Sequence, residues 1–395
     1  MEDKGCCPTG DGQGLVPVRQ VSPACSDKAG QTSAGSGASG SSAQVSPPSL
    51  KQSFVTGAIE TKAGPVPRIL SLLTRADRWG SYKARWGVGR MDYKVDPGLY
   101  ALGNPGDRVP VLVTANYKMT FDRLREALTG RDAWVLVLDT RGINVWCAAG
   151  KGTFGTEELV SRIESSGLAR VVSHRELIVP QLAGPGVSAH LVKKASGFKV
   201  TYGPIRATDL PAFLDADCKA TPEMRLKTFT TGERAVLIPV ELVGAFKIAL
   251  IVSPLVFLID TLWRAGSSWS VGLSHGLWSV LAILTGILAG AVLAPLLLPW
   301  LPGRAFSFKG SVIGAAAGLV FVILREIWGG WPDRLQMAAW FFLIPAFSAY
   351  LAMNFTGSST YTSLSGVRRE MRRAVPLQIG AGILGLGLWL GSHLL

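Results

Sequence analysis

The sequence predicts an α/β domain built on a parallel sheet, followed by an all-α transmembrane domain of five helices. Between about residues 65 and 225, short continuous apolar runs alternate with helical patterns, as expected for strands covered on both faces. From about residue 243 onward, charges become rare and apolar runs reach the ~20 residues that span a bilayer. We therefore expect a disordered Gly/Ser-rich tail at 1–50, the α/β domain at 51–235 and the transmembrane domain at 236–395.

The composition narrows the class of protein. Hydrophobic residues make up 48% of the 395 residues, a share that favours a membrane region. The five cysteines are scattered and form no C-x-x-C pair, which argues against a disulfide framework and against an iron–sulfur cluster held by this chain alone. The net charge of +13 is spread along the chain, so membrane topology explains it better than nucleic-acid binding does. The first fifty residues lack an apolar signal core, so no secretory signal peptide is expected.

The elements of the α/β domain can be placed in order. Helical patterns cover 121–130, which ends at Gly130, and 155–167, where Leu159 and Ile163 share one face. Apolar runs predict strands at 109–115, 133–140, 169–175 and 198–204. This alternation is typical of a Rossmann-like, doubly wound sheet, in which ligands bind beyond the carboxyl ends of the strands.

Five apolar segments predict the transmembrane helices, at about 243–263, 275–298, 309–328, 335–355 and 375–394. The connections after the second and fourth helices carry Arg304, Lys309, Arg368, Arg369, Arg372 and Arg373, whereas those after the first and third carry Arg264, Arg325 and Arg334. Because basic residues accumulate on the cytoplasmic side, we expect a multi-pass protein of the cytoplasmic membrane. Its soluble domain would then face the cytoplasm and its C-terminus would lie outside.

Asp260 is an unusual residue for a transmembrane helix. It could be a functional carboxylate inside the membrane, but its position near a predicted helix end favours a side chain that reaches the interface. The helices otherwise predict an anchor and a docking platform.

The stretch INVWCAAGKG, at 143–152, begins just beyond a predicted strand end. A P-loop would need glycine at Val145 and Ser or Thr at Gly152, so that pattern fails. Residues Gly150 to Gly155 spell G-x-G-x-x-G, and Glu176 follows about twenty residues later, but the motif does not open directly at the strand end. The stretch could also be a simple turn with a buried cysteine. For the whole protein, the alternative functions are a membrane-anchored nicotinamide-dinucleotide-binding oxidoreductase and a membrane protein whose soluble domain only binds a partner.

Asn144 is a good N-cap residue. If it caps a short helix, Cys147 is at the third helical position, near unpaired backbone N–H groups that favour a thiolate. The soluble part holds only His174 and His190 of the four histidines, and neither carries a cysteine-protease signature. A ligand to a soft metal centre fits this thiolate better than a protease nucleophile does.

The motif NVWCAAGKG resembles the cap helix of the HgcA family of mercury-methylating corrinoid proteins. That family is itself similar to the large subunit of the corrinoid iron–sulfur protein of the acetyl-CoA pathway. Four further segments carry the resemblance, which covers roughly residues 50–395: VLVTANYKMTFD, SHRELIVPQLAGPGVSAH, KKASGFKVTYGPIRATD and NFTGSSTYTSLSGVRREM.

The resemblance implies a corrinoid-dependent methyltransferase that carries a methyl group on cobalt and transfers it to inorganic mercury(II), forming methylmercury. The α/β domain would bind a base-off, cobalamin-type corrinoid, with Cys147 as the axial ligand of cobalt; no D-x-H-x-x-G signature offers a histidine instead. The residues expected to bind the cofactor are Thr114, Asn116, Asn144, Val145, Trp146, Cys147, Ala148, Ala149, Gly150, Lys151, His174, Gln181, Gly186, Val187 and Tyr202.

The resemblance also implies partners. A ferredoxin-like protein with two [4Fe–4S] clusters would supply electrons, and a folate-linked system would supply the methyl group. Cys6 and Cys7 form a vicinal thiol pair that is a candidate for capturing mercury(II). Membrane lipid is the remaining expected partner.

Overall fold

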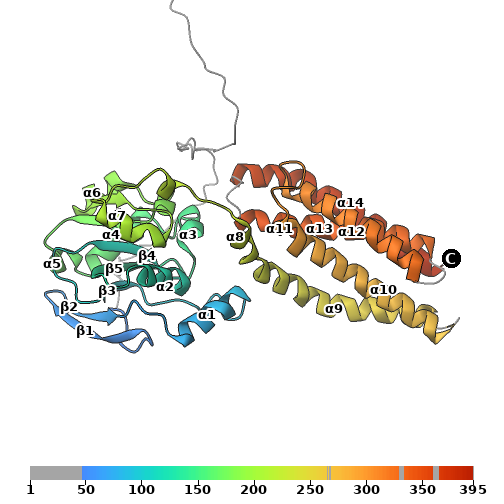
Figure 1. Cartoon of the computed structure of the whole chain (residues 1–395), viewed down its shortest axis with the longest axis horizontal. Coiled ribbons are helices and arrows are strands. Elements are labelled where there is room, and N and C mark those ends of the chain that lie inside the picture. The colour runs from blue at the N-terminus through green and yellow to red at the C-terminus, as the bar shows by residue number, and fades with distance from the viewer. Residues whose placement is uncertain (1–46, 265, 267, 329–332, 359–363, 395) are drawn as a thin grey trace, which may run out of the picture. The chain divides into compact units, whose positions relative to one another are not determined.

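The computed structural model describes residues 47–264, 266, 268–328, 333–358 and 364–394. It contains an α/β part and a helical part (Figure 1). Most of the predicted tail, including Cys6 and Cys7, lies outside the described residues.

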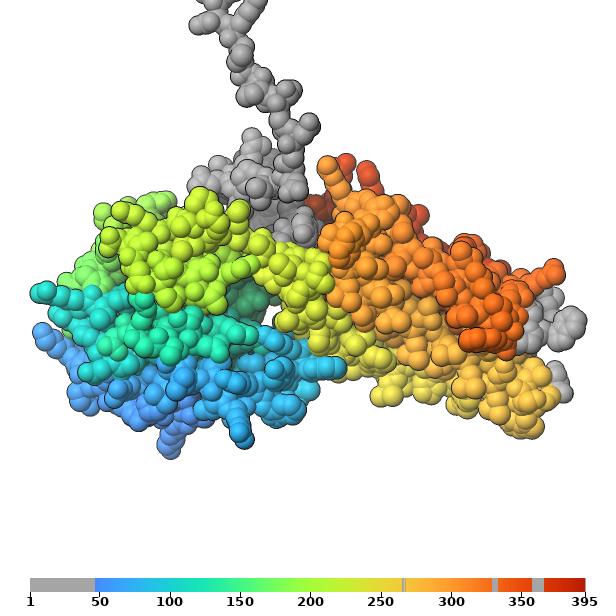
Figure 2. All heavy atoms as spheres, viewed as in Figure 1, coloured from blue at the N-terminus to red at the C-terminus, as the bar shows by residue number. Residues whose placement is uncertain are grey.

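The α/β part is built on a seven-stranded sheet with the strand order β1-β2-β3-β5-β4-β6-β7. The strands β5, β4, β6 and β7 are parallel, as predicted, whereas β3 runs antiparallel to β5, and β1 and β2 form an antiparallel hairpin. The sheet is therefore mixed. The strands are β1 (Val55–Thr61), β2 (Gly64–Ile69), β3 (Gly98–Leu102), β4 (Val111–Ala115), β5 (Ala133–Leu138), β6 (Glu176–Val179) and β7 (Lys199–Tyr202). Figure 2 shows the β1–β2 hairpin and α1, both blue, along one border of this part.

Helices cover both faces of the sheet, because the side chains of each strand alternate between them. Along β5, Leu136 faces a core shared with α4, α5 and α6, whereas Val135 faces a core shared with α2 and α7. The helices are α1 (Arg75–Arg85), α2 (Lys118–Ala127), α3 (Val145–Lys151), α4 (Thr156–Ser165), α5 (Leu168–Val171), α6 (Ala189–Ser196) and α7 (Leu210–Asp215), with short 3₁₀ turns η1 (Gln181–Ala183), η2 (Ala207–Asp209) and η3 (Glu223–Arg225).

One predicted strand is wrong. The segment 169–175 does not form a strand, since Leu168–Val171 is the short helix α5. The strand follows it as β6, whose Leu177 and Val179 are fully buried. The wrong prediction came from the consecutive valines Val171 and Val172, which form a short apolar run but do not pair with any strand of the sheet.

Among its described residues, the helical part contains five helices long and apolar enough to cross a membrane. Large apolar side chains such as Leu250, Ile251 and Leu377 are exposed on its surface, as expected for positions that face lipid. The elements are α8 (Thr231–Ala235), α9 (Ile238–Arg264), α10 (Trp269–Ile287), the π-helical turn η4 (Leu288–Leu293), α11 (Ala294–Leu296), α12 (Phe306–Trp328), α13 (Arg334–Asn354), the 3₁₀ turn η5 (Phe355–Ser358) and α14 (Leu364–Leu394).

Small residues let α12 and α13 pack closely. A Cβ atom on Gly310 would lie 2.7 Å from the carbonyl oxygen of Ser348, and one on Gly314 would lie 2.7 Å from Cα of Pro345. Such contacts between small residues are typical of helix packing in membranes.

Two expectations about the helical part are corrected. The last helix begins at Leu364, so Arg368–Arg373 belong to its first turns and not to a loop. Asp260 does not reach an interface, because it is fully buried among the helix ends. Its Oδ1 lies 2.8 Å from Nε2 of His393 and accepts a 3.3 Å hydrogen bond from Gln336. These partners satisfy the carboxylate inside the protein.

Candidate functional site

A cavity of about 240 Å³ lies at the carboxyl ends of the parallel strands, next to α3. Its lining comes from β4 and β6, from α2 and α3, and from the segment that follows β7. Thr114, Val145 and Trp146 are among the lining residues, together with Pro180 and Pro204. This is the edge at which α/β sheets of this kind bind ligands.

The helix α3 presents the cysteine. As predicted, Asn144 caps it: the side-chain oxygen of Asn144 accepts a 2.9 Å hydrogen bond from the backbone N–H of Cys147. The helix ends at Gly152, whose φ of 81° is the left-handed conformation that favours glycine. Cys147 is a free, half-buried cysteine in the first turn. Its sulfur is thus near the positive end of the short helix and is partly open to solvent.

Asn116 holds the chain that leads into α3. Its Oδ1 accepts hydrogen bonds from the N–H groups of Thr140, at 3.1 Å, and Gly142, at 2.9 Å, and from the Thr140 hydroxyl at 2.8 Å. Its amide nitrogen donates to Asp139 at 2.9 Å. Because Asn116 is buried and both its amide oxygen and its amide nitrogen are hydrogen-bonded within the protein, its contacts position the chain that leads into α3.

The segment after β6 lies against α3 and leaves no room for a side chain at one position. A Cβ atom on Gly186 would lie 2.2 Å from the carbonyl oxygen of Phe154 and 3.1 Å from Cα of Ala149. The Tyr202 hydroxyl donates a 2.5 Å hydrogen bond to the carbonyl oxygen of Val187, and burial raises the pKa of Tyr202. These contacts fix the wall of the site beside the cysteine.

The other predicted site residues are placed differently. Ala148 and Ala149 are buried in the core, while Gly150 and Lys151 are exposed at the end of α3. The Gln181 side chain is occupied by a hydrogen bond from Arg225. These five residues support or border the site, and none lines the cavity.

His174 does not belong to the site. Its Nε2 lies 2.9 Å from the carbonyl oxygen of Val109, just before β4 begins, so it is at the amino edge of the sheet, opposite the cavity. The sequence predicts His174 near the carboxyl end of a strand at 169–175, but the strand β6 starts only at Glu176, so His174 precedes it.

Sequence reasoning missed several lining residues, among them Gly203, Pro204 and Ile205. They follow directly after β7, so the same rule about strand ends could have identified them.

The dinucleotide motif is not arranged as such a site requires. Gly150 and Gly152 form the end of α3, and Gly155 precedes α4. The strand β5 ends at Leu138, so no glycine-rich turn joins a strand directly to a helix.

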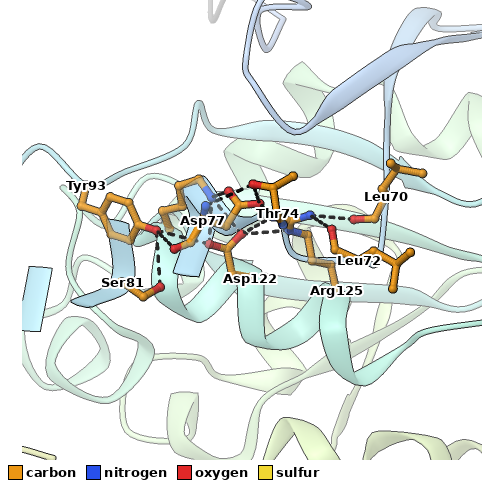
Figure 3. Close-up of polar contacts among 9 residues, drawn as sticks. Leu70, Leu72, Thr74, Asp77, Ser81, Tyr93, Asp122 and Arg125 are labelled. Atoms are coloured by element: carbon orange, nitrogen blue, oxygen red, sulfur yellow. Dashed lines mark hydrogen bonds and ion pairs between the residues drawn. The ribbon is translucent and has the colours of Figure 1, made fainter. Parts of the chain in front are cut away.

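A second polar cluster, formed by Asp77, Lys118, Asp122 and Arg125, is buried between α1 and α2 (Figure 3). Lys118 contacts Asp77 at 2.6 Å and Asp122 at 2.8 Å, and Arg125 contacts both carboxylates at 2.8 Å. Burial raises the pKa of Asp77, but the hydrogen bonds and charge of Lys118 and the hydrogen bonds of Thr74 outweigh it and hold that pKa well below its usual range.

The cluster balances two positive and two negative charges. Arg125 also donates to the carbonyl oxygens of Leu70 and Leu72, at 2.8 and 3.1 Å. Because its charges are paired within the protein, we interpret it as a clasp that fixes α1 and the preceding segment to α2.

Within the described ranges there is no group of three or more His, Cys, Asp or Glu residues that could hold a metal ion. Cys147 therefore offers a single protein ligand and not a complete coordination sphere.

Comparison with known proteins finds a local similarity in this part of the chain. Residues 88–214 match the family model of the CO dehydrogenase/acetyl-CoA synthase delta subunit. The acetyl-CoA decarbonylase/synthase complex subunit gamma of Methanopyrus kandleri is 35% identical over 130 residues, which are 32% of this chain and 28% of that protein. The corresponding subunit of Archaeoglobus fulgidus is 32% identical over 128 residues, 32% of this chain and 27% of that protein. That of Methanocaldococcus jannaschii is 38% identical over 99 residues, 24% and 20% of the two chains.

The similarity is local. It covers less than a third of the length of these relatives, and the matched family segment contains β4–β7, α3 and most of the residues around the cavity. The α/β part is therefore similar to subunits of acetyl-CoA-forming and acetyl-CoA-cleaving complexes, in line with the broader of the two expected resemblances.

Proposed function

We propose that this chain is a membrane-anchored corrinoid protein that carries a methyl group on cobalt. The observation that carries this proposal is the capped helix α3, which holds a half-buried free cysteine directly after two residues, Val145 and Trp146, that line a strand-end cavity. The helix lies inside the segment that is similar to the subunits of acetyl-CoA decarbonylase/synthase complexes.

The residues fit a cobalt cofactor in the chemistry they offer. Cys147 supplies one soft sulfur ligand; it does not itself line the cavity, whereas Val145 and Trp146, the two residues before it in α3, do. The cavity of about 240 Å³ is smaller than the ~300–1,000 Å³ of typical ligand pockets. A corrin ring would therefore contact the outer surface of α3 and the strand-end segments and would not be enclosed by this cavity.

When bound, the corrinoid supplies the cobalt–carbon chemistry, while the protein sets the axial ligand and access to it. Asn144 and Asn116 keep the first turn of α3 in place through their hydrogen bonds. The wall formed by Gly186 and Val187 keeps the helix from shifting. Cys147 is thereby held in place by contacts within the α/β part.

We further propose that the methyl acceptor is inorganic mercury(II). Mercury(II) is an electrophile, so it requires a methyl group that leaves with electron density. An anionic sulfur is a strong donor and suits such a transfer better than a neutral imidazole would. The resemblance of NVWCAAGKG to the mercury-methylating family supports this choice.

The electron donor and the methyl donor are also proposals. The described residues offer no cysteine cluster, which is consistent with a separate ferredoxin-like protein that carries two [4Fe–4S] clusters. A folate-linked methyl donor rests on the resemblance alone. The orientation, with the α/β part in the cytoplasm and the C-terminus outside, rests on the distribution of basic residues between the helix connections. The role of Cys6 and Cys7 in capturing mercury(II) rests on their being adjacent thiols.

The proposal can be tested with the purified full-length protein. After reconstitution with cobalamin, we expect a corrinoid absorbance spectrum that lacks the features of a cobalt–benzimidazole bond. With reductant, methyl donor and mercury(II), methylmercury should form. A nicotinamide or flavin signal without corrinoid binding would instead favour the oxidoreductase, and corrinoid binding without methylmercury would restrict the function to that of a methyl carrier.

A further inference from the structure

The helical part contains a groove of about 970 Å³ between α12, α13 and α14. The central helix α13 packs against both neighbours, while α12 and α14 touch each other little, so a recess is left over α13. The groove has two chemically different regions, and we refer to it as the α12–α14 groove.

The body of the groove is apolar. Its walls include Phe308 and Ala315 of α12, Phe341 and Phe342 of α13, and Leu377 of α14. The four large side chains among them are exposed on the protein surface. Such a surface suits the hydrocarbon chains of a lipid.

One end of the groove is basic. Arg304, Arg369 and Arg373 line it, with Glu370 as the only acidic lining residue. The Glu370 carboxylate is already engaged, because it accepts a 2.7 Å hydrogen bond from the backbone N–H of Ser307. Within the described part of the chain none of the three arginines forms an ion pair with a carboxylate, so their positive charge is available to a ligand.

The two arginines of α14 are arranged to act together. Arg369 and Arg373 are four residues apart and thus lie on one face of the helix, one turn from each other. Arg368 and Arg372 have the same spacing but do not line the groove. The helix therefore directs one of its two arginine pairs into the recess.

One polar side chain in the groove, that of Gln378, has no hydrogen-bond partner among the described residues. Both the amide oxygen and the amide nitrogen of Gln378 are buried, and neither finds a hydrogen-bond partner among the described residues. Leaving such groups unpaired costs free energy. Gln378 is about one helical turn after Ala374 in α14, and it lies between the basic end and the apolar body of the groove.

From these observations we infer that the α12–α14 groove binds one anionic phospholipid. The phosphate would interact with Arg369, Arg373 and Arg304, the polar linkage region would meet Gln378, and the acyl chains would lie along Phe308, Phe341 and Leu377. The charge of the basic end and the apolar length beyond it match a lipid with a negative headgroup. Basic pockets between transmembrane helices bind such headgroups in other proteins.

The test uses the full-length protein, freed of lipid in detergent and titrated with phosphatidylglycerol or with phosphatidylcholine of the same acyl chains. Native mass spectrometry would count the bound lipids. We expect one phosphatidylglycerol to bind with clear preference. The Arg369→Gln/Arg373→Gln double variant should lose about 25-fold in phosphatidylglycerol affinity, because each basic residue near an anionic headgroup contributes about fivefold.

The matched control is Arg368→Gln/Arg372→Gln, which removes the same charge from the same turns of α14 and should retain the preference. Arg304→Gln, in a separate segment, should weaken binding about fivefold and thus tests the site independently of α14. Equal binding of both lipids, or an equal loss in the control variant, would overturn the proposal. It would also be overturned if soluble glycerophosphate displaced the lipid at equal concentration, because the ligand would then be a free phosphate compound.

Discussion

The backbone N–H of Cys147 donates a 2.9 Å hydrogen bond to the side chain of Asn144, three residues earlier. This bond caps α3, which begins at Val145, and so makes Cys147 the third residue of the helix. The position of the sulfur is therefore determined by a local interaction within four residues. Five consequences can be measured in addition to the lipid test described above, and the first concerns this bond.

Asn144→Ala should destabilise the protein and loosen the first turn of α3. Loss of an N-cap typically costs about 1 kcal/mol, so the midpoint of denaturant unfolding of the α/β part should fall while the slope is unchanged. Corrinoid binding should weaken as well. Asn144→Asp keeps the accepting oxygen and should restore both properties; if it behaved like alanine, the cap would not be the cause.

Gly186→Ala should displace α3 from the wall of the site. Its Cβ atom would lie 2.2 Å from the Phe154 carbonyl oxygen, and forcing extra atoms into a packed contact costs about 1–3 kcal/mol. The matched control is Gly150→Ala in α3 itself, where a Cβ atom meets nothing within 4 Å. That change should leave the protein equally or more stable, because alanine favours helix over glycine by up to about 1 kcal/mol. Corrinoid titration and thermal unfolding of both variants would distinguish them.

Asp77→Asn should be much more harmful than loss of a surface ion pair. It leaves Lys118 and Arg125 buried with one carboxylate, and breaking a buried ion network by removing one member costs about 3–5 kcal/mol. The comparison variant is Glu126→Gln, which breaks the exposed pair with Arg123 and should change stability by less than about 1 kcal/mol.

The same clasp predicts an acid transition. The pKa of Asp77 is lower in the folded protein than its ordinary value of 3.8. The carboxylate therefore stabilises the fold above that pH and loses this contribution as the pH falls further. The unfolding free energy of the wild type, measured from pH 5 downward, should fall as Asp77 becomes protonated. The Asp77→Asn variant lacks this carboxylate, so the part of the pH dependence that comes from Asp77 should be absent.

The sequence predicted the elements whose signals are local or continuous. The runs at β4 and β5 are buried throughout, β7 was recognised although only Val200 of its four residues is buried, and the cap at Asn144 depends on one residue. The hairpin β1–β2 was missed because many of its residues are partly exposed, so it has no continuous apolar run. The strand β3 was not predicted either, because it belongs to no βαβ unit. Its antiparallel pairing with β5 joins two segments that are far apart in the sequence.

Side-chain partners distant in sequence could not be predicted. Asp260 looked like an interfacial residue because its own helix ends soon after it. Its partners Gln336 and His393 are on α13 and α14, and only the packing of the bundle brings them together. For the same reason the placement of His174 at the far edge of the sheet depended on where β6 begins.

Cys147→Ala is the decisive test of the proposed chemistry. The substitution should leave the fold intact, because Cys147 is half-buried in the first turn of α3 and alanine is the best helix former. Cobalamin should still bind through the surfaces around the cavity, but the absorbance features of a cobalt–sulfur bond should vanish and methylmercury formation should fall by orders of magnitude. Cys147→His would restore a ligand with weaker electron donation and should bind cobalamin while methylating poorly. The control is Cys218→Ala, which removes the other free cysteine of the described residues and should retain wild-type methylation. A Cys147→Ala protein that methylated mercury as fast as this control would show that the sulfur is not the ligand on which the reaction depends.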